Sequence, residues 1–307
     1  MFGEVVWRYR RQTGSQCQAG KTTMSEMLVP FTYDYMFKAM WVSALVGGAC
    51  AFLSVYLVLK GWSLMGDALA HSVVPGVAAA YILQLPYAAG AFFAGILASS
   101  AMSLIKQKTR LREDVVTGLV FTSLFALGLL MASLHPTSVN IQSIVLGNIL
   151  AISDEDVVQV AIIAGVSLFI LCLKWKDLMV IFFDENHART IGVNVALLKV
   201  LFFALLSACT VAALQTVGAV LVVALLITPG ATAYLLTDRF KNLILISVSI
   251  GTVGSFTGAY LSYFLDGATG GVIVVMHVLI FLTAFIFAPK HGLMAARRRA
   301  GPAAVKP

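Results

Sequence analysis

Nine runs of apolar residues, each close to 20 residues long, dominate this chain of 307 residues and limit what it can fold into. They cover residues 38–59, 64–85, 87–106, 114–134, 156–174, 196–214, 216–236, 242–264 and 271–289. A helix needs about 20 apolar residues to cross the roughly 30 Å hydrocarbon layer of a bilayer. Only 11% of the residues are charged, against about 25% in a soluble domain. The sequence therefore predicts an all-α, polytopic membrane protein with eight or nine transmembrane helices.

The basic residues predict which ends of these helices face the cytoplasm. Sixteen of the 21 lysines and arginines lie on alternate connections, after the first, third, fifth, seventh and ninth runs. Cytoplasmic loops carry an excess of lysine and arginine, so we expect these connections and the C-terminus inside the cell. The other connections carry carboxylates and no opposing base, at Asp154, Glu155, Asp156 and Asp266. Nine crossings place the N-terminus outside, where the other five basic residues break the rule, or Lys38 alone if translation starts at Met27. Eight crossings, with the first run incomplete, place it inside.

The two ends of the chain differ from its apolar middle. Residues 1–37 form a polar tail, residues 38–289 the transmembrane domain, and residues 290–307 a basic tail that we expect in the cytoplasm. An alternative start at Met24 or Met27 would leave the first residues out of the native protein. The net charge of +7 follows the loop pattern, so the expected surroundings are membrane lipid and not nucleic acid. Residues 138–150 are short and amphipathic, which predicts an interfacial or re-entrant piece.

Asp67 and His71 are the most informative polar pair inside the predicted spans. They are four residues apart, so a helix places both side chains on one face, about one turn from each other. A carboxylate oxygen and an imidazole nitrogen form half of a site for a divalent metal. Asp67 is the only carboxylate that we place inside a span, where such a residue is costly and is a functional candidate. A second interpretation stays open, in which Asp67 caps the helix near the membrane surface and His71 packs in the core.

A short polar segment between the fifth and sixth runs is the second candidate site. Asp184 can cap a helix, Glu185 suits its first turn, and Gly192 can end it. A two-turn helix with the small Ala188 inside it and Arg189 near its end suits docking onto a cytoplasmic protein. An amphipathic connector without a partner explains the same pattern, so both interpretations stay open.

Four motifs follow one another along the chain. They are Gly66-Asp67-Ala68-x-x-His71 with Pro75-Gly76, Asp184-Glu185-x-x-Ala188-Arg189-x-x-Gly192, the run from Gly218 to Ala233, and Ala288-Pro289-Lys290-His291-Gly292. Together they resemble the ABC-3 family, the permease subunits of bacterial ATP-driven importers for manganese, zinc and chelated iron. The resemblance covers about residues 36–294. It implies a fold like that of a type II ABC importer permease, in the bacterial cytoplasmic (inner) membrane.

The resemblance implies a permease subunit that passes a divalent transition metal into the cytoplasm, with Mn²⁺ or Fe²⁺ favoured over Zn²⁺. Such a subunit is not an enzyme, because ATP hydrolysis is expected on a separate chain, and it holds no permanently bound cofactor. The implied partners are that cytoplasmic ABC ATPase, an extracytoplasmic metal-binding protein, and a second permease copy or a close paralogue.

The resemblance also implies roles for single residues. Asp67 and His71 match the family's metal site, and two copies of the pair would supply two oxygen and two nitrogen ligands. The residues expected to couple to the ATPase are Asp184, Glu185, His187, Ala188, Arg189 and Gly192. Two positions depart from the family: Ala70 stands where many members have serine, and His277 where glutamine or another polar residue is usual. His277 is thus either a further group on the metal pathway or a histidine packed in the core.

Two other classes of function are open to a polytopic chain. A stand-alone, proton-coupled metal transporter would need more carboxylates in the membrane, and the sequence shows one and no obvious repeat. An intramembrane metalloenzyme would need three ligands and a general base, and no H-E-x-x-H motif occurs. Because a metal binds only neutral imidazole, uptake through His71 is expected to weaken as the medium is acidified.

Overall fold

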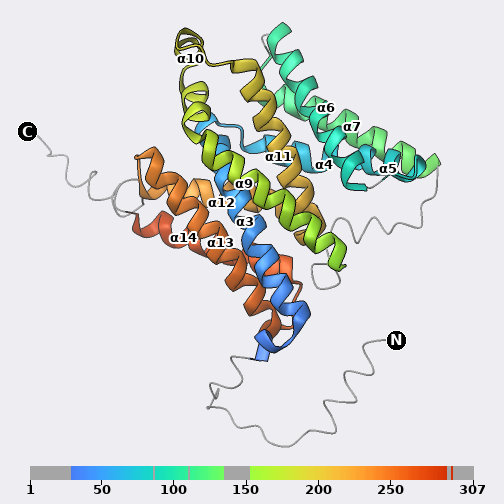
Figure 1. The fold of residues 1–307 in the computed structure, drawn as a ribbon, viewed down its shortest axis with the longest axis vertical. Coiled ribbons are helices and arrows are strands. Elements are labelled where there is room, and N and C mark those ends of the chain that lie inside the picture. Colours follow the sequence, from blue (N-terminus) through green and yellow to red (C-terminus); the bar gives the residue numbers. More distant parts are fainter. Residues whose placement is uncertain (1–28, 86, 110, 135–152, 289–291, 293–307) are drawn as a thin grey trace, which may run out of the picture.

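The computed structural model describes residues 29–85, 87–109, 111–134, 153–288 and 292, and all structural statements concern these residues. The predicted segment at residues 138–150, most of the N-terminal tail and nearly all of the C-terminal tail lie outside them. The described part consists of helices and turns, without a strand (Figure 1). The predicted all-α class is therefore confirmed.

The helices follow the predicted apolar runs closely. Their bounds are α3 (Asp34–Lys60), α4 (Ser63–Ser72), α5 (Val74–Ile82), α6 (Tyr87–Lys108), α7 (Glu113–Leu134), α9 (Asp154–Phe183), α10 (Glu185–Thr190), α11 (Val195–Val217), α12 (Ala219–Leu236), α13 (Phe240–Leu265) and α14 (Thr269–Phe287). Among the described residues, α3, α7, α9, α11, α13 and α14 are long and apolar enough to cross a membrane. Shorter apolar stretches lie within α6 and α12, at residues 89–102 and 222–236.

Two helices differ from the prediction. The run at residues 64–85 was expected to form one helix, but α4 ends at Ser72 and α5 begins at Val74 with Pro75 in its first turn. Proline has no N–H to donate, and its ring clashes with the carbonyl four residues earlier, so it interrupts the helix. The fifth run was expected to end at residue 174, but α9 continues to Phe183. Leu178 and Ile181 extend its buried face, which keeps this part helical.

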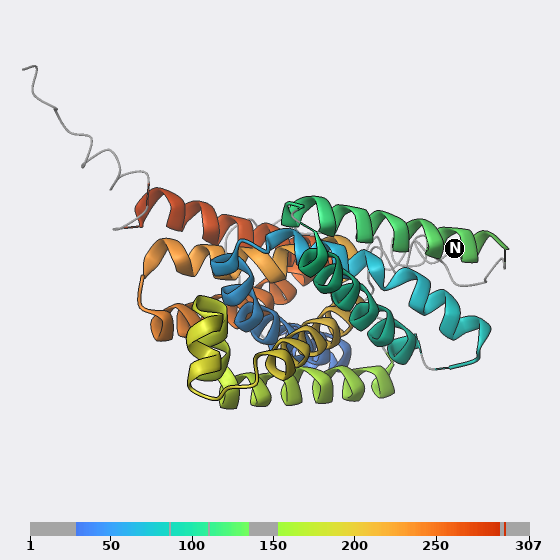
Figure 2. The same ribbon diagram turned by 90° about the horizontal axis from the view of Figure 1, so that it is seen from above.

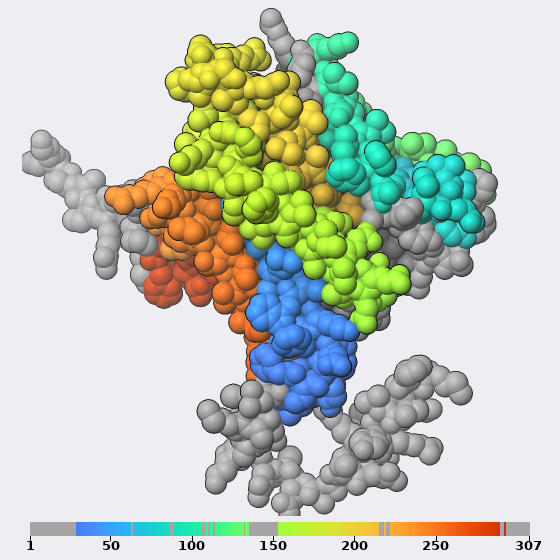
Figure 3. Space-filling view, in the orientation of Figure 1, coloured from blue at the N-terminus to red at the C-terminus, as the bar shows by residue number. Residues whose placement is uncertain are grey.

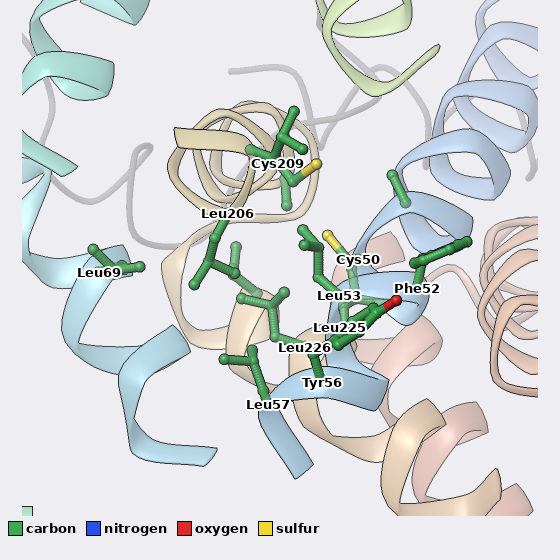
Figure 4. Close-up of a cluster of buried hydrophobic side chains, with 14 of the residues drawn as sticks. Cys50, Phe52, Leu53, Tyr56, Leu57, Leu69, Leu206, Cys209, Leu225 and Leu226 are labelled. Atoms are coloured by element: carbon green, nitrogen blue, oxygen red, sulfur yellow. The ribbon is translucent and has the colours of Figure 1, made fainter. Parts of the chain in front are cut away.

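α3 lies in the middle of the bundle, with α9 along one edge (Figure 2). A Cβ added at Gly47 would lie 2.5 Å from the carbonyl oxygen of Gly251 on α13, and a Cβ added at Gly251 equally close to that of Gly47. The two backbones therefore touch, as small residues allow in membrane helices. A buried cluster surrounds α3 and includes Cys50, Leu53 and Leu57, Leu206 and Cys209 of α11, and Leu225 and Leu226 of α12 (Figure 4).

Contacts at both ends of α3 tie it to α9. Lys38 pairs with Asp154 at the start of both helices, and Lys60 donates a hydrogen bond of 3.1 Å to the carbonyl oxygen of Phe182 at their ends. The two helices thus run in parallel from the predicted outer face to the cytoplasmic face, and the first apolar run forms a complete helix that is long enough to cross the membrane. The pairing also corrects one expectation, because Lys38 reaches an outer carboxylate that the sequence left without a base.

Candidate metal-binding site

Asp67 and His71 lie on α4, and their side chains meet as the spacing predicts. His71 Nε2 is 3.4 Å from Asp67 Oδ1. The side chains of Asp67 and His71 are 40% and 27% exposed, so the pair opens onto a surface of the chain. A carboxylate oxygen and an imidazole nitrogen in this arrangement can both ligate a divalent cation that arrives from that surface.

Two aromatic side chains of α7 hold the His71 ring. Its centroid is 5.3 Å from that of Phe121 and 5.5 Å from that of Phe125, and these two rings stack on each other. Such ring pairs restrict the imidazole orientation and contribute about 0.5–1.5 kcal/mol beyond burial. These two phenylalanines were not predicted from the sequence. Their signal is the spacing of four residues on one helix, which places both on one face.

Glycines allow α7 and α12 to pack closely against the interrupted helix formed by α4 and α5. A Cβ added at Gly66 of α4 would lie 2.9 Å from the Leu226 side chain of α12. A Cβ added at Gly128 of α7 would lie 2.8 Å from the backbone nitrogen of Pro75. The Asp67–His71 pair is thus carried by a short helix held between α7 and α12.

The described residues of one chain do not complete a metal site. They contain no group of three or more histidine, cysteine or carboxylate side chains that could hold an ion together. Within the described residues, the pair can therefore offer at most two ligands to one ion.

His277 lies on α14 and makes no contact with Asp67 or His71. It is fully buried on α14, and its Nδ1 donates to the carbonyl oxygen of Ile273 over 2.8 Å. A Cβ added at Gly254 of α13 would lie 2.9 Å from its ring, and one at Gly258 would lie 2.7 Å from Ile273. Of the two interpretations of His277, the geometry supports the histidine packed between helices.

The predicted cytoplasmic helix is present as α10. Asp184 Oδ1 accepts hydrogen bonds from the backbone N–H groups of Asn186 and His187, at 2.9 and 3.0 Å, so the predicted cap is confirmed. Gly192, with a φ of +81°, follows the helix in the left-handed region that favours glycine. Glu185 pairs with Lys199 of α11 at 2.6 Å. Figure 3 shows α10 at one end of the molecule.

Ala188 is buried within the chain, whereas its motif suggested a position that contacts a cytoplasmic protein. Its exposed fraction is 0%, so it cannot touch another protein while α10 keeps this position. Its small side chain instead lets α10 lie close against α9 and α11. The exposed side chains of α10 are Asn186, His187, Arg189 and Thr190.

Known proteins resemble the chain over most of its length. Residues 32–288 match the family model of the ABC 3 transport family. The chain is 67% identical over 273 residues to YfeC, the chelated iron transport system membrane protein of Yersinia pestis, covering 89% of this chain and 93% of that one. It is 46% identical over 278 residues to MntB, the manganese transport system membrane protein of Synechocystis, covering 90% and 91%.

Two solved structures of transport proteins have folds similar to that of this chain. The fold matches a chain of PsaBC from Streptococcus pneumoniae, solved in complex with Fab, with a TM-score of 0.80 and 32% identity. That match covers 90% of this chain and 100% of the other. A putative metal-chelate type ABC transporter in an inward-facing conformation matches with a TM-score of 0.62 and 18% identity, which supports the fold alone.

Proposed function

Because this chain belongs to the ABC 3 transport family and is a multi-pass membrane protein, we propose that it is the permease subunit of an ATP-driven importer for a divalent transition metal. The observation that carries the proposal is the Asp67–His71 pair on a helix interrupted by Pro75. The cargo is Mn²⁺ or Fe²⁺, with Zn²⁺ as a third candidate, because the similar proteins are named for iron and manganese. The metal is the substrate, and the proposed subunit holds no permanent cofactor.

Because the Asp67–His71 pair is partly exposed, a second copy of the chain could complete a metal site with it. One chain offers one oxygen and one nitrogen ligand at Asp67 and His71. A second copy, or a close paralogue, with its own pair opposite would give two oxygens and two nitrogens. Such a set suits Mn²⁺, Fe²⁺ or Zn²⁺, and it contains no soft sulfur ligand of the kind that favours Cu⁺.

Two further partners complete the proposed importer. A cytoplasmic ATPase docks on the exposed side chains of α10, including His187 and Arg189, and an extracytoplasmic metal-binding protein delivers the ion from outside. The ion pair between Glu185 and Lys199 and the buried Ala188 make α10 move together with its neighbours. ATP hydrolysis belongs to the ATPase chain.

The end of α9 offers a physical link from α10 to the metal pair. Phe182 accepts the hydrogen bond from Lys60, and its ring is 5.6 Å from that of Trp62. Trp62 directly precedes α4, which carries Asp67 and His71. A displacement of α10 by the ATPase would therefore reach the pair through packed side chains.

Substitution of the pair tests the proposal. We expect Asp67→Asn and His71→Ala each to abolish uptake of radiolabelled Mn²⁺ and Fe²⁺ in cells, while the permease still co-purifies with its ATPase. Asp177→Asn on α9 is a matched control, because that carboxylate is 41% exposed, close to the 40% of Asp67. Normal uptake by either pair variant would remove the site assignment, and competition with unlabelled metals would rank Mn²⁺, Fe²⁺ and Zn²⁺.

A stand-alone proton-coupled transporter is the less favoured alternative, because the matching family consists of ABC transport proteins. Reconstitution of this chain alone into vesicles separates the two mechanisms. We expect no uptake driven by a proton gradient, and gradient-driven uptake without an ATPase would favour the alternative.

A further inference from the structure

The helices α12, α13 and α14 pack against one another (Figure 1). A groove lies between their cytoplasmic halves. Its volume is about 570 Å³, within the range of about 300–1,000 Å³ that is typical of sites for small molecules. Its lining includes Leu236 of α12, Leu245 and Ile246 of α13, and Ile280 of α14. No residue of the metal pair or of α10 lines it.

The groove suits hydrocarbon better than a polar solute. Three hydroxyl groups line it, from Thr232, Ser249 and Thr283. Each donates its proton to a carbonyl oxygen of its own helix, at 2.7, 2.8 and 2.7 Å. Because these donors are already used, a ligand group that accepts hydrogen bonds would lose those to water without regaining them, whereas an alkyl chain would lose none.

Two basic residues lie near the cytoplasmic ends of the helices that line the groove, and neither of them lines it. Lys241 is four residues before Leu245 on α13, so both lie on one face, about one turn apart. Arg239 precedes the helix and follows Leu236 of α12 by three residues. Both basic residues are exposed, and neither belongs to an ion pair within the described part of the chain.

The position of these bases matches the depth of lipid phosphates. The connection between α12 and α13 lies on the cytoplasmic side in the topology that the basic loops predict. Helices leave the hydrocarbon layer at that level, and the negative charge of anionic lipids attracts lysine and arginine there. An apolar groove with a basic rim at this depth is complementary to a lipid that has a negative head and an alkyl tail.

We propose that this groove binds one acyl chain of an anionic phospholipid from the cytoplasmic leaflet, while Lys241 and Arg239 hold the lipid phosphate. The proposal does not depend on the metal site, so either can fail without the other.

Native mass spectrometry of the full chain purified in mild detergent tests the head-group part. The probes are phosphatidylglycerol and phosphatidylcholine with identical acyl chains. We expect the protein to retain more phosphatidylglycerol, and Lys241→Gln and Arg239→Gln each to weaken its retention about five-fold, from the attraction of one base near the membrane surface. Lys176→Gln is the control, because Lys176 is an exposed base at the cytoplasmic end of α9 and should not change retention.

Filling the groove tests the acyl-chain part. Ser249→Trp places an indole in the groove, and we expect it to lower retention of both lipids. Val253→Trp is the matched control, because Val253 is 59% exposed on the same helix and does not line the groove. Equal retention of the two lipids by the unaltered protein, or equal phosphatidylglycerol retention by the two tryptophan variants, would overturn the proposal. A disulfide between two copies through Ala284→Cys would also overturn it, because a second chain would then cover the groove.

Discussion

Replacing Gly76 by alanine tests how closely the broken helix is packed. Gly76 of α5 lies against Gly90 of α6, and an added Cβ would lie 2.2 Å from the carbonyl oxygen of Gly90 and 2.5 Å from the Cβ of Ala94. Carbon and oxygen atoms in close contact across helices are about 3.3 Å apart or more. The two helices would therefore have to separate by about 1 Å.

The expected loss of stability follows from two opposing effects. Overpacking costs up to about 3 kcal/mol, and the upper value applies because the obstructing carbonyl belongs to the backbone and cannot rotate away. Alanine in a helix interior is favoured over glycine by about 1 kcal/mol. The free energy of unfolding of Gly76→Ala should therefore fall by about 2 kcal/mol. Because Val73 alone separates α5 from α4, metal uptake should fall as well.

Denaturation with increasing SDS in mixed micelles, followed by circular dichroism, measures this loss. Gly165→Ala on α9 is the control, since no heavy atom lies within 4 Å of its added Cβ. We expect that variant to be as stable as the unaltered protein, or more stable by up to about 1 kcal/mol. A Gly76→Ala protein with unaltered stability and uptake would refute the packing argument.

Two further predictions concern His277 and α10. His277→Gln should leave the KM for metal unchanged, since His277 packs against Gly254. A tenfold rise in that KM would instead indicate that His277 takes part in metal binding. Lys199→Ala should lower uptake and ATPase co-purification by releasing Glu185. The exchanged pair, Glu185→Lys with Lys199→Glu, should restore both, and a failure to recover would show that the ion pair is not what positions α10.

Much of the fold could be predicted because membrane helices are encoded locally. Twenty apolar residues in a row must satisfy their backbone within one helix, so the spans follow from the sequence alone. The Asp184 cap and the Gly192 ending were equally predictable, since each depends on residues within one or two turns. The interruption at Pro75 was missed because proline is tolerated inside membrane helices when neighbours satisfy the freed carbonyl groups.

The sequence by itself determined which segments enter the membrane, which loops carry the positive charge, and that Asp67 and His71 share one face of a helix. Only the tertiary structure decided which helices become neighbours. It set Lys38 against Asp154, 116 residues away, packed two rings of α7 against His71, and turned Ala188 and His277 inward. The reason is that every apolar helix has a similar affinity for lipid. The choice of neighbours then depends on the shape of small and large side chains across helix interfaces, which hydropathy along one chain does not record.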